Sequence, residues 1–211
     1  DLFSFEYQAL KLYQELEGFH LNDKNPEALI DVELERLAFI NEKSTLPEKD
    51  SLYLATLYKL EKQYISHPSS TEISYEIASK LNYDENEAIP FFELGKETEL
   101  TSTARKWDRK KAAEICEAAI KRFPDSFGAK NCIVLTESIK QPTLSITANF
   151  ANIPGKPALA LISYKNLTKV YLRILKTDPE TDLNFRNTEQ NKLLEIYSSM
   201  KPVKSWEQLL P

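Results

Sequence analysis

Apolar residues recur at helical spacing through the first two-thirds of the chain. Phe5, Ala9, Leu12 and Leu16 fall at i, i+4, i+7 and i+11, which places them on one face of a helix that Gly18 is expected to end. Comparable stripes, bounded by residues that cap or stop helices, predict further helices near residues 26–38, 53–64, 69–81, 108–123 and 126–139. Residues 83–103 break the pattern and predict an irregular insertion.

Several predicted helix ends carry residues suited to helix termini. Asn25 precedes a proline at a first helical position, and Asp108 can cap the helix that follows it. Ser69, with Glu72 three residues later, has the spacing of a capping box. Pro124 ends a helix. The last two helices are predicted to turn these residues inward: Ala112, Ile115, Cys116, Ala119, Ile120, Phe123, Ala129, Cys132, Ile133 and Ile139.

The period changes from helical to two at Pro142. Apolar and polar residues then alternate over residues 143–150, which predicts a strand with one buried and one solvated face. Residues 158–164 and 170–174 predict two further strands, and Leu193, Leu194 and Tyr197 predict a short helix. A domain boundary is therefore expected near residues 140–142, between a helical region 1–140 and a β region 141–211.

These elements predict an α+β fold. The first region is expected to be an N-terminal array of antiparallel helical hairpins, and the second a small, incomplete antiparallel β-sandwich-type domain. Three strands and a short helix make a small core and leave open sheet edges. The β region is therefore expected either to pack on the helices or to continue with strands beyond Pro211.

Composition narrows the classes of function. The 211 residues carry a net charge of -5, which gives no electrostatic reason to expect nucleic acid or an anionic membrane surface as a partner. No apolar run is long enough to span a membrane. A phosphate-binding loop needs clustered glycines, and the four glycines of this chain are far apart in the sequence. The two histidines have no neighbours at metal-ligand spacing, which argues against a zinc-protease helix. We therefore predict no catalytic, cofactor-binding or metal-binding residues.

The ends of the sequence favour a fragment. The only methionine is Met200, so Asp1 is not a natural translation start. An N-terminal signal removed on export, or a shortened chain, would explain such a start. Leu210 and Pro211 fall where β structure is still unfinished. We expect a piece of a larger exported protein.

Residues 109–135 resemble a tetratricopeptide-type (TPR) repeat. Ala112, Ala119 and Pro124 occupy the small, small and proline positions of that motif's second helix. Residues 68–81 match the same motif more weakly, but the predicted insertion at 83–103 prevents a fixed repeat period between the two segments. The pattern favours a helical-hairpin array more than a true repeat family.

The transition between the two regions carries a second resemblance. It rests on the order and spacing of these segments: Ala112-Ala113-Glu114-Ile115-Cys116, Phe123-Pro124, Gly128-Ala129-Lys130-Asn131-Cys132, Pro157-Ala158-Leu159, Ser163 to Ile174, and Pro202-Val203-Lys204-Ser205-Trp206. Together they resemble the N-terminal region of large bacterial α2-macroglobulin-family proteins, in which a helical segment precedes the first macroglobulin-like β domain. That resemblance implies an exported protein of the periplasm or cell envelope that traps or inhibits proteases.

The family's working parts do not carry over to these residues. Many members have a Cys-x-Glu-Gln thioester, but Cys116 is followed by Glu-Ala-Ala and Cys132 by Ile-Val-Leu. Both cysteines lie on apolar helix faces joined by a short turn. In an exported protein the two could form a disulfide. Two small buried thiols are an equally good interpretation. Both alternatives stay open.

Other candidate groups have simpler explanations. Asp178, Glu180 and Asp182 alternate like the start of a calcium loop, but Leu183 stands where that loop needs glycine. Asn166-Leu167-Thr168 is a glycosylation sequon that in a bacterial protein is only a turn. Tyr53, Tyr58 and Tyr64 have helical spacing and are predicted to lie in the core. A basic cluster at a helix start is predicted to be a solvated face: Arg105, Lys106, Arg109, Lys110 and Lys111.

The sequence therefore favours a non-catalytic scaffold fragment of an envelope α2-macroglobulin-like protein. Its partners would be the rest of its own chain and, through it, proteases or envelope proteins. The alternative is a stand-alone helical-repeat adaptor that binds a peptide or protein in a groove. A carboxylate-based glycan hydrolase is a distant third, since no pair of acidic residues is singled out.

Overall fold

The computed structural model describes residues 4–82, 107–148, 153, 156–157, 160–178 and 190–210. Over these residues the fold is α+β, with seven helices and two antiparallel sheets of two strands each. The chain divides into two compact units, Asp1–Lys140 and Gln141–Pro211. Among the described residues the first unit contains helices and no strand, and the second contains all four strands, so the predicted α+β class is confirmed. The TPR-like arrangement and the β-sandwich stay predictions.

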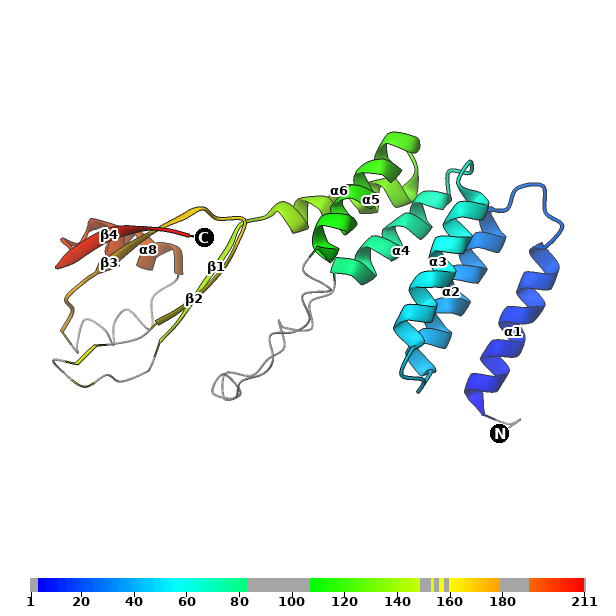
Figure 1. The fold of residues 1–211 in the computed structure, drawn as a ribbon, viewed down its shortest axis with the longest axis horizontal. Helices are drawn as coiled ribbons and strands as arrows, with labels where there is room; N and C mark the ends of the chain where they lie inside the picture. The colour runs from blue at the N-terminus through cyan, green and yellow to red at the C-terminus, as the bar shows by residue number, and fades with distance from the viewer. Residues whose placement is uncertain are drawn as a thin grey trace. The chain divides into compact units, whose positions relative to one another are not determined.

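The helical unit consists of α1 (Phe5–His20), α2 (Glu27–Lys43), α3 (Lys49–Tyr64), α4 (Ser70–Asn82), α5 (Asp108–Arg122) and α6 (Phe127–Lys140). Each helix predicted from the apolar stripes is present. Figure 1 shows consecutive helices of this unit side by side. The predicted insertion at 83–103 lies outside the described residues.

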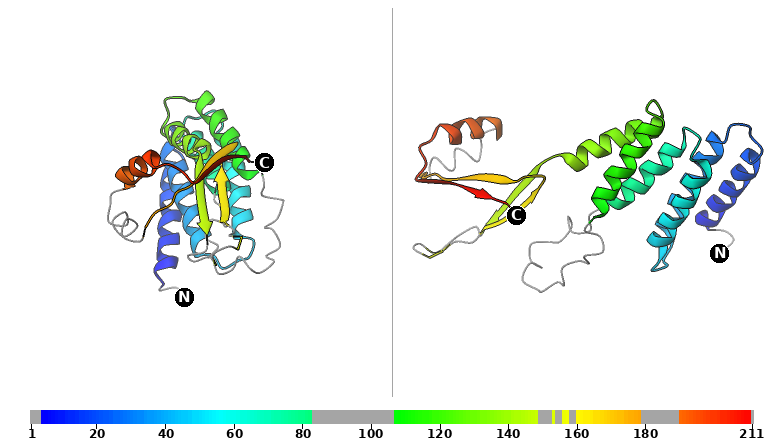
Figure 2. Two further views of the ribbon diagram at one scale, coloured as in Figure 1. Left: turned by 90° about the vertical axis from the view of Figure 1, so that its left-hand side faces the viewer. Right: turned by 45° about the horizontal axis from the view of Figure 1, so that its top comes forward.

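The core of the helical unit is centred on α4. Seven of its thirteen residues are buried, including Ile73, Ile77 and Leu81, which the sequence pattern placed on one face. They meet Leu57 and Leu60 of α3. On the other side of α4, the helices α5 and α6 contribute small buried residues: Ala112, Cys116, Ala119, Ala129 and Cys132. The right-hand view of Figure 2 shows α4, α5 and α6 lying together. Burial of each large aliphatic side chain contributes about 2 kcal/mol.

The first helix differs from its prediction. It continues past Gly18 to His20, and the stripe expected to face inward is only partly covered: Phe5 is 90 % and Leu12 57 % exposed, whereas Ala9 and Leu16 are partly buried. The helix instead turns Tyr13 toward Phe39 of α2, with ring centroids 5.9 Å apart. A Glu17–Arg36 ion pair joins the same two helices. The face of α1 with Tyr13 and Glu17 lies against α2 because α2 provides an aromatic ring and a cation as contacts.

The β unit contains β1 (Thr143–Ala148), β2 (Ala160–Lys165), β3 (Lys169–Ile174), α8 (Gln190–Ser199) and β4 (Lys204–Leu209). β1 pairs with β2, and β3 pairs with β4. The sequence predicted the first three strands and the helix but missed β4. Its residues Lys-Ser-Trp-Glu-Gln-Leu show no apolar alternation, and the β3 residues with which they pair lie 30 to 40 positions earlier in the chain.

The chain moves from one sheet to the other at the predicted turn 166–168. Asn166 has φ 55°, a left-handed conformation that asparagine tolerates better than most residues. From within β3, the Arg173 guanidinium donates to the carbonyls of Ser198 (3.3 Å) and Met200 (2.8 Å), which fixes the end of α8. Val170 is the buried apolar residue of the described strands, and the expected buried face of β1 is exposed.

Candidate functional site

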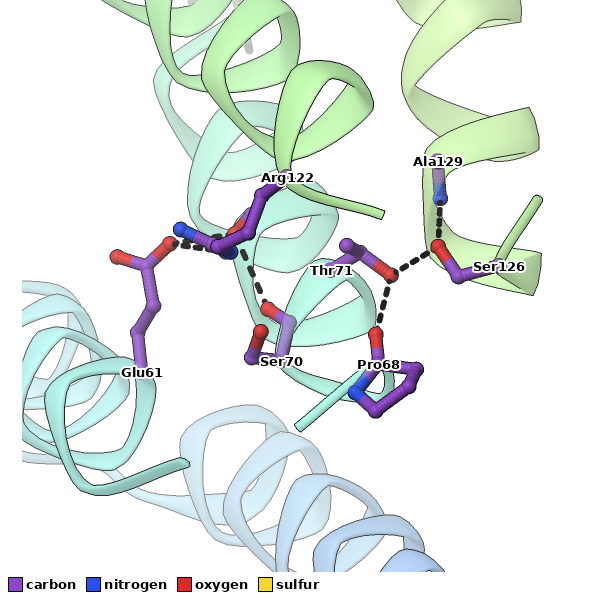
Figure 3. Close-up of polar contacts among 8 residues, drawn as sticks. Glu61, Pro68, Ser70, Thr71, Arg122, Ser126 and Ala129 are labelled. Carbon is purple, nitrogen blue, oxygen red and sulfur yellow. Dashed lines mark hydrogen bonds and ion pairs between the residues drawn. The ribbon is translucent and has the colours of Figure 1, made fainter. Parts of the chain in front are cut away.

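Three features of the helical unit hold chemistry worth testing: a polar lock around α4, a pair of thiols, and an acidic face between α2 and α4. In the lock, shown in Figure 3, Arg122 of α5 donates to Ser74 Oγ (2.9 Å) and pairs with Glu61 of α3 (3.3 Å). Ser74 also hydrogen-bonds Glu61. Three helices therefore share one partly buried charge pair, which fixes their register.

A second set of contacts joins α4 to α6. The hydroxyls of Thr71 and Ser126 lie 2.8 Å apart, and Ser126 Oγ accepts a hydrogen bond from the Ala129 amide at 3.3 Å (Figure 3). Beside them Gly128 packs directly on the backbone of α4. A Cβ there would stand 2.2 Å from the Glu72 nitrogen and 2.3 Å from the Thr71 carbonyl carbon. The glycine is therefore required for the close approach of the two helices.

The predicted cysteine pair lies between α5 and α6. Cys116 and Cys132 are fully buried and are free thiols in this structure. A hydrogen bond links the two side chains, and that contact together with burial raises the pKa of the Cys132 thiol. The structure thus brings the two residues together. It holds them as two small buried thiols, and their pairing in a disulfide stays a prediction.

The third feature comes from the arrangement of α2 and α4. One cavity of about 450 Å³ is lined by the N-terminal ends of both helices, and another of about 360 Å³ by their C-terminal halves. The two helices therefore run in the same direction, with a cavity at each end of the strip between them. We call this strip the α2/α4 face. Tyr53 of α3 lines the second cavity too. The lining residues are Asp23, Asn25, Glu27, Ala28, Ile30, Asp31, Ala38, Asn41, Glu42, Tyr53, Ser69, Glu72, Glu76, Ser79 and Lys80.

Carboxylates of the two helices oppose each other along the α2/α4 face. Burial raises the pKa of Glu72, and the charges of Asp31 and Glu27 add to that shift. Burial likewise raises the pKa of Glu76, with Glu35 adding to it. The cause of each pKa shift is the partial burial of an α4 carboxylate, with a smaller contribution from like charge on α2.

The C-terminal cavity also has an aromatic wall. Burial, with the charges of Glu76 and Glu35, raises the pKa of Tyr53 to about 12, so its hydroxyl stays protonated at neutral pH. Lys80 lines the same cavity, but its ammonium pairs with Asp50 at 2.7 Å. Its charge is thus largely committed to a carboxylate outside the α2/α4 face.

Both histidines lie near the N-terminal cavity, in contacts that the sequence did not predict. His20 Nδ1 is 2.8 Å from Asp23, and His67 Nε2 is 2.9 Å from Asn25 Oδ1. Asn25 Oδ1 also accepts from the Glu27 amide at 3.3 Å. The N-cap of α2 is nevertheless Pro26, without a side-chain cap hydrogen bond, so the proline lies one position before the first helical position predicted for it. The His67 contact fixes the chain before α4 against the chain before α2.

The remaining sequence candidates do not form a common site. Tyr53 is buried, Tyr58 is exposed and Tyr64 is partly buried, so these tyrosines do not line one groove. In the basic cluster Lys111 pairs with Asp108 at 3.6 Å and Lys110 approaches Glu114 at 3.9 Å, both at the surface. Arg105, Lys106, Glu180 and Asp182 lie outside the described residues.

Sequence reasoning missed the α2/α4 face, although a signal was present. Glu27, Asp31 and Glu35 follow one another at i, i+4 and i+8, and Glu72 precedes Glu76 by four residues. Like charges at this spacing destabilise a helix by a few tenths of a kcal/mol per pair. Two rows of like charge that destabilise their own helices indicate a functional role for these residues, but only the structure shows that the rows on α2 and α4 face each other. The capping box expected at Ser69 and Glu72 is replaced by this arrangement, since both side chains line the cavity.

The described part of the chain offers no group of three acidic, histidine or cysteine side chains suited to a metal ion. Within the same residues, no helix is long and apolar enough to cross a membrane. Comparison with known proteins adds no identification: no family model, curated protein or solved structure matches the chain.

Proposed function

We propose that this chain is a non-catalytic scaffold segment of an exported α2-macroglobulin-like protein that acts on proteases. In this proposal the helical unit, with its TPR-like hairpins, is a stiff arm. The β unit is the first part of a macroglobulin-like β-sandwich, completed by further strands of a larger protein. The family resemblance of the sequence motivates the proposal, and the surface of the β unit is the observation that carries it.

The β unit exposes more apolar surface than a finished domain would. Each of its two sheets has two strands, so the described strands leave their outer edges open. Large apolar side chains of this unit are exposed at Leu144, Ile146, Leu161, Tyr171, Ile174, Leu194, Val203, Trp206 and Leu209. Exposed apolar side chains that gather into a patch mark an interface or an unfinished core, and the proposal takes these side chains to form such a patch. Additional strands would cover it and pair the open edges.

The lock around α4 supports the stiff-arm part of the proposal. Arg122 ties α5 to α3 and α4, and Gly128 lets α6 rest on the α4 backbone. Close backbone packing and a shared partly buried ion pair resist sliding of one helix along another. A unit built in this way keeps its own helices in one register, as a stiff arm requires.

Limited proteolysis and a trapping assay test the proposal. In this 211-residue chain, a low dose of a broad-specificity protease should cut residues 141–211 well before the helical unit. In the intact parent protein the same β residues should be protected. The purified parent should also block a protease from digesting a large protein while leaving cleavage of a small peptide substrate unchanged. A β unit that resists proteolysis alone, together with a parent that leaves protein digestion unaffected, would refute it.

A second function is favoured by one observation, the α2/α4 face with its two cavities. We propose that the helical unit is alternatively an adaptor that binds a peptide or protein segment along this face. Solenoid-like helical arrays present such extended surfaces to their partners. A screen of the chain against a random peptide library tests it, because substitution of Ala38 by a bulky arginine should abolish the binding of any peptide that occupies this face.

A further inference from the structure

β1 is an open sheet edge without charge. It pairs with β2 on one side, and no described strand pairs with its other side, so alternate backbone N–H and C=O groups point away from the β1/β2 pair (Figure 1). Natural sheets usually protect such an edge with charged side chains, proline or a covering segment. β3 and β4 each have two charged residues and β2 has one, whereas β1 has none. Among the described strands, β1 is therefore the best suited to pair with a further strand.

The two faces of β1 differ in chemistry. Leu144 and Ile146 point to one face, where they lie opposite Tyr164 and Ile162 of β2. The residues between and beside them are threonine, serine and threonine, which point to the other face. On the apolar face Leu144 is 49 % and Ile146 52 % exposed, whereas their two β2 partners are partly buried. β1 is thus the more open strand of the pair on this face.

The order of side chains along β1 is the same in both directions. Residues 143–147 read Thr-Leu-Ser-Ile-Thr, a pattern that is symmetric in chemistry about Ser145. In an antiparallel pair of two copies of β1 with their Ser145 residues opposite each other, each Leu144 lies opposite Ile146 of the second copy. Each Thr143 then lies opposite Thr147 of the second copy. Opposite threonine or serine side chains can hydrogen-bond, and the aliphatic side chains lose exposed area to each other.

This pairing also extends the apolar face without a break. A two-fold axis perpendicular to the sheet, passing between the two Ser145 residues, joins the hairpins of both copies into one four-stranded sheet. The apolar side chains of both copies then lie on the same face. A slip of one residue would place aliphatic side chains opposite hydroxyls. A slip of two would place Leu144 opposite the smaller Ala148, so the pattern favours the register centred on Ser145.

We propose that two copies of this chain associate through β1, each β1 pairing antiparallel with β1 of the second copy across Ser145. A two-stranded hairpin is marginally stable in water, and the four-stranded sheet supplies the strands that it lacks. The inference goes beyond both functions proposed above and rests on neither. In the scaffold proposal the additional strands pair with the other open edges of the β unit, and in the adaptor proposal the α2/α4 face stays free.

Sedimentation velocity of the full 211-residue chain measures the association. The contact between two short strands is at the small end of specific protein interfaces, so we expect a dissociation constant of about 10–100 µM. The chain should therefore be mostly monomeric at about 1 µM and mostly dimeric at about 200 µM. Larger oligomers are not expected, because a two-fold pairing uses the β1 edge of both copies.

Two isoleucine-to-lysine variants separate the β1 edge from general apolar attraction. Ile146→Lys places an ammonium group on each side of the central serine pair and should raise the dissociation constant at least about tenfold. Ile174→Lys makes the same change of side chain and of net charge, from -5 to -4, on β3, where Ile174 is 49 % exposed. This control should change the dissociation constant less than about twofold.

A disulfide cross-link tests the register without adding charge. Ser145→Cys would place two thiols opposite each other on Cα atoms about 4.5–5.5 Å apart, which is within the range of a disulfide. In a buffer of reduced and oxidised glutathione the two thiols should form one disulfide, their two electrons passing to oxidised glutathione. A covalent dimer on a non-reducing gel detects it. The native thiols of Cys116 and Cys132 are fully buried and stay out of this exchange.

Ser163→Cys is the matched control for the cross-link. Ser163 is an exposed serine of β2 that lies directly opposite Ser145 in the same hairpin. In the proposed dimer the two Ser163 residues are three strand spacings apart, or about 14 Å, which is too far for a disulfide. This variant should form covalent dimers at least about tenfold more slowly than Ser145→Cys, because direct contact gives a high effective concentration.

Three results would overturn the inference. A chain that stays monomeric at every concentration has no such interface. Equal weakening by Ile146→Lys and Ile174→Lys would mean that association does not depend on β1. Equal rates of cross-linking for Ser145→Cys and Ser163→Cys would refute the register, and this comparison holds even where Ile146→Lys disturbs the hairpin itself. None of these results bears on protease trapping by the parent protein or on peptide binding at the α2/α4 face.

Discussion

Substituting Gly128 by alanine should destabilise the helical unit strongly, although alanine is the better helix former. The added Cβ would stand 2.2 Å from the Glu72 nitrogen, which is 1.2 Å short of the 3.4 Å at which ordinary contact begins. The nearest atoms are all backbone atoms of α4, so no side chain can rotate away. The N-terminal ends of α4 and α6 would have to separate by about that distance.

The magnitude follows from three contributions. Overpacking of a close contact costs about 1–3 kcal/mol. Separation would also break the 2.8 Å contact between the Thr71 and Ser126 hydroxyls, at about 1 kcal/mol. Alanine returns about 1 kcal/mol through its helix propensity. We therefore expect Gly128→Ala to lower the free energy of unfolding by about 2 kcal/mol, a large part of the stability of a typical domain.

Gly18 provides the matched control. It lies near the end of α1, and a Cβ there would meet nothing within 4 Å. Gly18→Ala should therefore raise stability by about 0.5–1 kcal/mol. Urea unfolding followed by circular dichroism at 222 nm measures both changes, with the slope against urea as a check on compactness. A neutral or stabilising effect of Gly128→Ala would refute the close packing of α6 on α4.

Other predictions concern charge and thiol chemistry. The Glu72→Gln, Glu76→Gln double variant should be more stable than the parent chain at pH 7, by less than about 1 kcal/mol because solvent screens both groups. Because the pKa values of Glu72 and Glu76 are raised in the folded chain, the folded chain takes up protons before the unfolded chain as the pH falls. The stability advantage of the double variant should therefore shrink between pH 7 and pH 4 and vanish below pH 4. Thermal unfolding across that range measures the advantage, and an advantage that grows on acidification would contradict the pKa shifts. Arg122→Ala should lower the free energy of unfolding in urea by about 2 kcal/mol, because it leaves the partly buried Glu61 carboxylate unpaired. Lys140→Ala breaks a surface ion pair and should lower it by less than about 0.5 kcal/mol. Similar losses in the two variants would mean that the Arg122 contacts stabilise the chain no more than a surface pair does. Both cysteines should resist a thiol reagent in the native chain and react in denaturant, as counted by mass spectrometry; two thiols that stay unreactive in denaturant until reduced would show a disulfide instead.

Part of the candidate site was accessible from the sequence. The cysteines could be placed on facing apolar stripes because buried positions in helices repeat every three to four residues. The acidic rows on α2 and α4 were visible as like charges at i, i+4 spacing. That they oppose each other was not, because nothing local states which face of α2 meets α4. The lock of Arg122 with Glu61 likewise joins residues sixty-one positions apart.

The sequence by itself determined the helices, three of the strands and the change from α to β structure near residue 141. These depend on the period of apolar residues and on prolines, which act over a few residues of chain. Only the tertiary structure decided which side of α1 faces α2, that β4 pairs with β3, and that Gly128 touches the α4 backbone. Those outcomes depend on what a distant segment offers as a neighbour, and a local pattern contains no information about that neighbour.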